Sequence, residues 1–148
     1  MKHLWHLVKR FATSIGARPL GPDERLRVGA ILTPAEAALF DRFNAADQRH
    51  ALVVLARFDA VAPGAPLAVR RAALLHDIGK VDSSLGTLAR VVATIVGGRT
   101  AAFRAYHAHE AHGAELLRKA GSDVVTVALV AGVGEEPWRG WLAVSDAV

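Results

Sequence analysis

The chain has 148 residues, 52% of them hydrophobic and 22% charged, which are the proportions of one folded domain and exclude a disordered chain. It contains no cysteine, which excludes disulfides and thiolate metal sites and agrees with a reducing compartment, so we expect a cytoplasmic protein. The net charge of +4 favours an anionic partner, which includes phosphorylated small molecules, nucleic acid and anionic membranes.

The first predicted element covers residues 2–14, where apolar residues recur at helical spacing between Lys2, Lys9 and Arg10. The charges interrupt this stretch too early for a membrane span or a secretory signal. Two interpretations remain open. The helix packs on the rest of the domain, or residues 1–15 make peripheral contact with an anionic membrane.

Short segments rich in proline, glycine and acidic residues divide the rest of the chain into pieces of helical length. Thr33 and Glu36 have the spacing of a capping box, which predicts a helix that starts at Pro34. Strand-like alternation is scarce, so the sequence predicts an all-α fold, a compact multi-helix bundle with short connections. We expect residues 1–44 to be a helical segment packed on a domain at 45–148. The predicted helices after the first lie at 22–31, 34–43, 46–61, 66–78, 83–96, 101–119, 123–132 and 138–147.

Three chemically distinctive residues lie on or near the two most apolar predicted helices. His50 lies on the helix 46–61, where a buried imidazole needs a hydrogen-bond partner or a metal. His76 and Asp77 lie at the end of the helix 66–78, which we expect Gly79 to cap. Adjacent helical residues point about 100° apart, so His76 and Asp77 suit neighbouring positions around one octahedral metal ion. The alternative is a helix that simply ends in polar residues.

A third histidine-rich segment reads AYHAHEAHGAELL, at residues 105–117. His109 and His112 share one face of the predicted helix, and His107 points elsewhere. The segment is either a solvated helix face or part of a site, and the site interpretation is strongest for His109.

The order of these residues, His50, then His76-Asp77, then Asp146 in WLAVSDAV, resembles the H…HD…D pattern of the HD superfamily of metal-dependent phosphohydrolases. The resemblance covers about residues 45–148, and the whole chain is similar to short stand-alone bacterial HD proteins. It implies an all-α domain in which His50, His76, Asp77 and Asp146 bind one divalent metal ion. Imidazole and carboxylate ligands together favour Mn²⁺, Fe²⁺, Co²⁺, Ni²⁺ or Zn²⁺ over Mg²⁺.

The resemblance also implies catalytic roles. Asp77 would hold the attacking water, and Lys80 would bind a phosphate of a phosphorylated small-molecule substrate; the alternative for Lys80 is a cation at the negative end of the helix dipole. His109 would bind a second metal or the substrate. In relatives with the fuller ligand set another histidine follows, but the segment after residue 123, TVALVAGVGEEPWRGW, has none. Glu135 and Glu136 lie in this segment, but they do not match the missing histidine in residue type. Because that histidine is absent, we expect one metal ion.

Two functional hypotheses follow. The first is a metal-dependent phosphohydrolase that acts on a nucleotide or another phosphate ester. The second is a degenerate HD domain that binds a ligand, a membrane surface or a protein partner without catalysis. The sequence argues against a nucleic-acid partner, because lysine and arginine are scattered and no recognition helix stands out.

Overall fold

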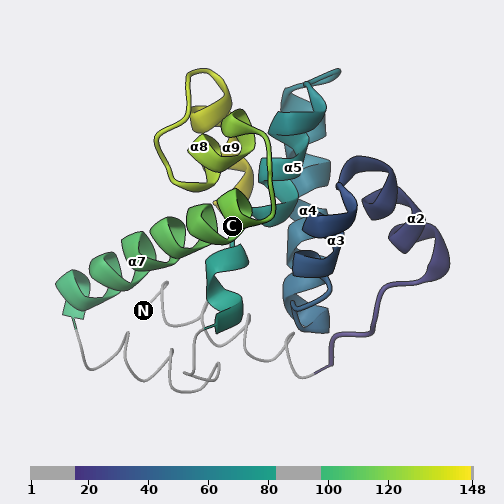
Figure 1. The fold of residues 1–148 in the computed structure, drawn as a ribbon, viewed down its shortest axis with the longest axis horizontal. Coiled ribbons are helices and arrows are strands. Elements are labelled where there is room, and N and C mark those ends of the chain that lie inside the picture. Colours follow the sequence, from purple (N-terminus) through teal and green to yellow (C-terminus); the bar gives the residue numbers. More distant parts are fainter. Residues whose placement is uncertain (1–15, 83–97, 148) are drawn as a thin grey trace.

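The computed structural model describes residues 16–82 and 98–147, and every regular element in these ranges is helical (Figure 1). The all-α prediction is therefore confirmed. The predicted helices at 2–14 and 83–96 lie outside the described residues, and so do both interpretations of residues 1–15, packing on the domain and contact with a membrane. The helices, in chain order, are α2 (Pro22–Ile31), α3 (Pro34–Phe40), α4 (Ala45–Val61), α5 (Leu67–Leu75), the 3-10 helix η1 (Ile78–Asp82), α7 (Gly98–Lys119), α8 (Val124–Val130) and α9 (Trp138–Asp146).

The start of α3 has the hydrogen bonds that the sequence predicts. The Glu36 amide donates to Thr33 Oγ1 at 3.2 Å, and the Thr33 amide donates to Glu36 Oε2 at 2.9 Å. This reciprocal pairing satisfies two backbone donors at the start of the helix. The α4 and α8 helices also begin with a side-chain cap, since the Asn44 and Asp123 side chains accept from the backbone amides of Asp47 and Val125.

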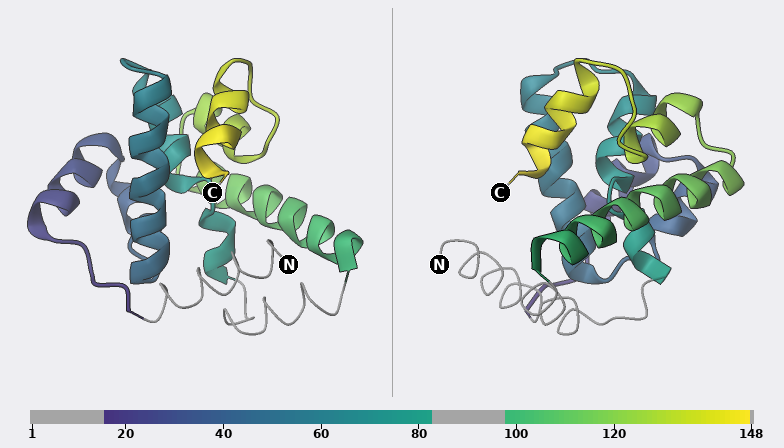
Figure 2. Two further views of the ribbon diagram at one scale, coloured as in Figure 1. Left: turned by 180° about the vertical axis from the view of Figure 1, so that it is seen from behind. Right: turned by 90° about the vertical axis from the view of Figure 1, so that its left-hand side faces the viewer.

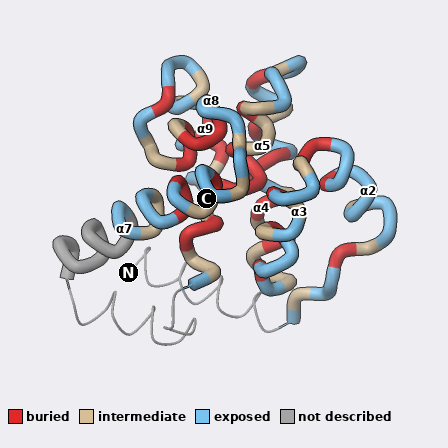
Figure 3. The backbone as a smooth tube through the Cα atoms, viewed as in Figure 1, coloured by how far each residue is buried: buried red, intermediate tan, exposed pale blue. Residues whose placement is uncertain are grey.

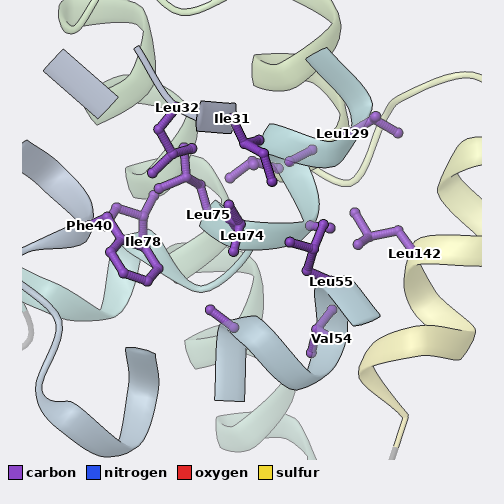
Figure 4. Packing of buried hydrophobic residues seen from close by; sticks show 14 of the residues in the cluster. Ile31, Leu32, Phe40, Val54, Leu55, Leu74, Leu75, Ile78, Leu129 and Leu142 are labelled. Atoms are coloured by element: carbon purple, nitrogen blue, oxygen red, sulfur yellow. The ribbon is translucent and has the colours of Figure 1, made fainter. Parts of the chain in front are cut away.

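The core forms where α4 and α5 pack together at the centre of the molecule. The α5 helix also contacts α8 and α2, while α4 contacts α9 (Figure 2). Burial is concentrated in this centre and falls off toward the outer turns of α2 and the free face of α7 (Figure 3). In Figure 4, Leu74 and Leu75 of α5 lie between Phe40 on one side and Leu55 on the other. The largest fully buried apolar side chains include Phe58, Leu74, Leu75, Ile78 and Leu117.

The segment before α4 is joined to the core by polar contacts as well as apolar ones. Arg49 of α4 donates to the carbonyl of Pro19 at 2.9 Å, and Arg71 of α5 donates to the carbonyl of Ile31 at 2.7 Å. Leu20 and Val28 belong to the same buried cluster as the α4 and α5 side chains. The domain boundary at residues 44 and 45 stays a prediction.

No helix in the described ranges combines the length and the hydrophobicity that a membrane crossing needs.

Candidate metal centre

Four of the predicted site residues lie together, although they come from three parts of the chain. His50 belongs to α4, His76 and Asp77 follow α5, and Asp146 ends α9. The Asp146 Oδ1 atom is 3.0 Å from His50 Nε2 and 3.2 Å from His76 Nε2. Asp77 Oδ2 is 3.6 Å from His76 Nε2. Metal-ligating atoms of His50, His76 and Asp77 all lie within 4.8 Å of one another. The structure therefore brings the four residues to one point, while their role as ligands stays a prediction.

The backbone at the end of α5 fixes the orientation of the His76 ring. Its Nδ1 atom is 2.9 Å from the carbonyl oxygen of Ala73, one turn earlier, and a carbonyl can only accept. Nδ1 therefore carries a proton, and Nε2 is the ring nitrogen that faces the Asp77 and Asp146 carboxylates. Nε2 is buried without a hydrogen bond of good geometry. An orphaned imidazole nitrogen beside two carboxylates fits a divalent metal ion.

The prediction that one helix runs from 66 to 78 and is capped by Gly79 is wrong. The α5 helix ends at Leu75, and His76 is its C-cap residue, with φ −54° and ψ −34°. The chain continues from Ile78 as a 3-10 helix. Gly79 does not adopt the left-handed conformation of a capping glycine, since its φ is not positive. A Cβ atom on Gly79 would lie 1.9 Å from the His109 carbonyl oxygen and 2.9 Å from the Gly113 amide nitrogen. Glycine is therefore required for the close approach of η1 to α7.

Hydrogen bonds and charge interactions together outweigh the effect of burial on the pKa values of the cluster. Burial disfavours the charged form of the Asp146 carboxyl, but the two imidazoles beside it outweigh that cost and hold its pKa far below the usual range. Burial likewise opposes ionisation of Asp77, yet His76 and Lys80 lower its pKa. Burial also opposes a charge on His76, and the Asp146 and Asp77 carboxylates still raise its pKa. Both carboxylates are therefore ionised at neutral pH and carry the charge that would neutralise a divalent cation.

A cavity of about 320 Å³ opens beside the cluster. Its volume is at the lower end of the range for small-molecule sites. Polar groups of the cluster form one part of its wall, and apolar side chains of α8 and α9 form another. The lining comprises His76, Asp77, Lys80, His109, Glu110, Leu129, Val130, Gly132, Arg139, Gly140, Leu142, Ala143 and Asp146.

Lys80 lines this cavity and also contacts Asp77 of the four-residue cluster. Its Nζ atom is 2.5 Å from Asp77 Oδ2, so it acts on that carboxylate in addition to facing the cavity. The predicted phosphate contact stays a prediction.

The three clustered histidines of α7 separate in the structure. His109 lines the cavity. His112 lies outside it, with Nε2 2.7 Å from Asp82 Oδ2, and so links α7 to the end of η1. His107 is exposed, with Nδ1 3.2 Å from Glu110 Oε2. Of these histidines, only His109 is placed to contact a bound molecule beside the cluster.

The cavity lining also contains two charged residues that sequence reasoning missed, Glu110 and Arg139. Arg139 precedes Asp146 by seven residues, and this spacing places both on one face of a helix, which is a signal present in the sequence. Glu135 and Glu136, the nearest substitutes for the missing histidine, do not line the cavity. Glu136 instead accepts a hydrogen bond from the Gly140 amide at 2.9 Å.

The chain matches a known protein family. A family model described as HD domain matches residues 41–138, which is more than half of the chain. The matched range contains His50, His76 and Asp77 and ends before Asp146. No curated protein and no solved structure matches the chain significantly.

Proposed function

The chain belongs to the HD-domain family, and from this premise we propose that it is a metal-dependent phosphohydrolase that acts on a nucleotide or another phosphate ester. The observation that carries the proposal is the orphaned, buried Nε2 of His76 facing two ionised carboxylates beside an open cavity. The contact of Nδ1 with the Ala73 carbonyl fixes the ring so that Nε2 is the nitrogen available to a metal ion.

The donor set supports one divalent ion held by His50, His76, Asp77 and Asp146. Two carboxylates balance its charge, and two neutral imidazoles favour Mn²⁺, Fe²⁺, Co²⁺, Ni²⁺ or Zn²⁺ over Mg²⁺. When bound, such an ion polarises a phosphoryl oxygen and lowers the pKa of a water molecule. Side chains of the protein orient the attacking water, accept its proton and bind the substrate phosphate.

Asp77 and Lys80 are the residues to which we assign catalytic roles. Asp77 offers a carboxylate oxygen that orients an attacking water and accepts its proton. Lys80 Nζ lies beside that carboxylate and in the cavity wall, where an ammonium group binds a phosphate oxygen of the substrate. His109, on the α7 side of the cavity, contacts the substrate or a second ion.

The experiment is a metal analysis followed by an activity assay on the same preparation. We expect about one divalent ion per chain after incubation with Mn²⁺, and release of phosphate from at least one member of a panel of nucleotides and p-nitrophenyl phosphate. The His76→Ala variant should lose both metal and activity. The control is His107→Ala, which removes an exposed histidine of α7 that does not line the cavity.

A second candidate function is an HD domain that binds a ligand or a partner without hydrolysis. The observation that favours it is the absence of a histidine after residue 123, together with the position of Glu135 and Glu136 outside the cavity. Metal binding without turnover of any compound in the panel would support this candidate. Absence of metal binding would contradict the phosphohydrolase proposal.

A further inference from the structure

The α9 helix contributes two charged groups of opposite sign to the same cavity. Arg139 lies near the start of α9 and Asp146 at its end, beside the proposed metal ligands, and both residues line the cavity. They are seven residues apart, which is about two helical turns and about 10 Å along the helix axis. Leu142 and Ala143, which lie between them on the same face, form an apolar stretch of the wall. The cavity therefore extends from the metal cluster past apolar surface to a guanidinium group.

Glu136 holds that guanidinium group in place. Arg139 Nε and Nη2 donate to Glu136 Oε1 at 2.9 and 2.7 Å, while the other oxygen of Glu136 accepts from the Gly140 amide. A guanidinium has five N–H donors in a planar fork, and this contact uses two of them on one edge. Among the side chains that the structure describes, Nη1 has no hydrogen-bond acceptor. That second edge has the geometry that binds a carboxylate or a phosphate through two parallel hydrogen bonds.

The balance of charge in the cavity suits a ligand with more than one negative group. The lining has three carboxylates, Asp77, Glu110 and Asp146, and two permanent cations, Lys80 and Arg139. The Glu110 carboxylate has a partner outside the cavity, because its Oε2 atom lies 3.2 Å from His107 Nδ1. With a divalent ion bound, the formal charge of this wall becomes about +1. Lys80 lies beside Asp77 at the cluster, whereas Arg139 lies two turns away, so the two cations cannot serve the same anionic group of a small ligand.

We propose that Arg139 binds a second anionic group of the substrate, so that the substrate is a phosphate ester with a phosphate or carboxylate remote from the reacting phosphoryl group. This inference rests on the proposed function of the metal cluster, and it adds the class of substrate. Arg139 would determine specificity and would take no part in the chemical step.

The test measures binding at equilibrium to the Mn²⁺-loaded protein by calorimetry, with two matched pairs of probes. Ribose 5-phosphate is compared with ribose 1,5-bisphosphate, and glycerol 3-phosphate with 3-phosphoglycerate, so that each pair differs by one anionic group. We expect the doubly anionic member of at least one pair to bind about 10-fold more tightly. The pair that shows the preference identifies the second group as phosphate or carboxylate.

Arg139→Gln should abolish this preference and leave the affinity for the singly phosphorylated probe unchanged. Arg139→Lys, which keeps the charge but loses the fork, should retain part of the preference. The matched control is Arg118→Gln, because Arg118 also pairs with a glutamate three residues earlier on a helix, Glu115 at 3.3 Å, but lies outside the cavity. For a probe that is hydrolysed, the Arg139→Gln effect should be confined to KM.

Three results would overturn the inference: no preference in the unmodified protein, no binding of any of the four probes, or an equal loss for both members of a pair in Arg139→Gln. A preference that depends on Arg139 without any hydrolysis would leave the inference standing and contradict the proposed activity. The two failures are therefore distinguishable.

Discussion

The Lys80 ammonium group faces two anionic partners, the Asp77 carboxylate and the proposed substrate phosphate. It lies 2.5 Å from Asp77 Oδ2, and it also lines the cavity where we place the substrate phosphate. The charges of His76 and Lys80 together lower the pKa of the Asp77 carboxyl. Loss of Lys80 therefore affects substrate binding and the ionisation of Asp77 at the same time.

We expect Lys80→Ala to lower kcat/KM about 10- to 150-fold, because a charge-assisted contact contributes about 1.5–3 kcal/mol. Metal content should change little, because the amine is not among the four proposed ligands. The control is Lys119→Ala, which removes a lysine exposed on α7. Unchanged kcat/KM would contradict the phosphate contact.

Asp82 provides a test of pH dependence away from the metal cluster. His112 and Arg42 both donate to its carboxylate, and these contacts lower its pKa. A carboxyl group whose folded pKa is depressed stabilises the protein above its unfolded pKa of about 4, and that stabilisation is lost as the pH falls through the folded pKa. We expect Asp82→Asn to lower the free energy of unfolding at pH 7, and this effect should shrink progressively as the pH falls below about 4. Denaturant titrations across this range measure the difference, with Glu115→Gln on α7 as control. A difference that does not change with pH would contradict the ionic contact.

Sequence reasoning identified the four clustered residues because their chemistry is recognisable from residue type and order. The apolar helices that carry His50 and His76 predict burial of these two residues, whereas the grouping with Asp77 and Asp146 came from the resemblance to the H…HD…D pattern. Arg139 was missed because its role depends on which face of α9 meets the cavity. That orientation is set by packing of α9 against α4, a contact between segments far apart in the chain.

At the scale of elements, the contact between η1 and α7 is the feature that the sequence predicts least well. An apolar run that ends in HDIGK has the composition of a continuing helix, and a glycine after it is typical of a cap. The structure ends α5 at Leu75 because the chain must turn there to bring Gly79 against the backbone of α7. Local sequence predicts that a helix exists, whereas its last turn depends on a tertiary contact. The capped helix start at Pro34 was predicted correctly because its signal, the Thr33 and Glu36 capping box, is local.

The close approach at Gly79 yields a stability prediction. We expect Gly79→Ala to lower the free energy of unfolding by about 2–4 kcal/mol, because the new methyl group would overlap the His109 carbonyl and force η1 away from α7. The same displacement should weaken metal binding, since η1 follows His76 and Asp77 directly. Urea denaturation and metal titration measure the two effects.

Gly29→Ala is the matched control for this substitution. Gly29 lies within α2, and nothing lies within 4 Å of a Cβ atom built on it. Alanine should raise the free energy of unfolding there by up to about 1 kcal/mol, because alanine has a higher helix propensity than glycine in a helix interior. Equal stabilities of the two variants would show that η1 and α7 are not held at this distance in solution.

At the scale of the whole molecule, the proposed ligands join three helices that are distant in sequence. His50 comes from α4, His76 and Asp77 from the end of α5, and Asp146 from the last turn of α9. The α9 helix packs against α4, and its buried residues are only Leu142 and Ser145. Trp138, at the other end of α9, packs partly buried against the core, and a metal ion bound by Asp146 would add a link to the centre at the last turn.

We therefore expect divalent metal to raise the melting temperature of the protein. An ion that binds only the folded state contributes about 2.7 kcal/mol at a 100-fold excess over its Kd, which corresponds to a shift of about 5–15 °C for a chain of this size. Calorimetry after removal of metal with a chelator and re-addition of Mn²⁺, Co²⁺, Ni²⁺ or Zn²⁺ measures the shift. Asp146→Asn should reduce it strongly, since this change removes the charge that lies between both imidazoles. His107→Ala should retain it in full. The absence of a shift with all four metals would contradict the metal centre, because four converging ligands cannot bind an ion without stabilising the fold that assembles them.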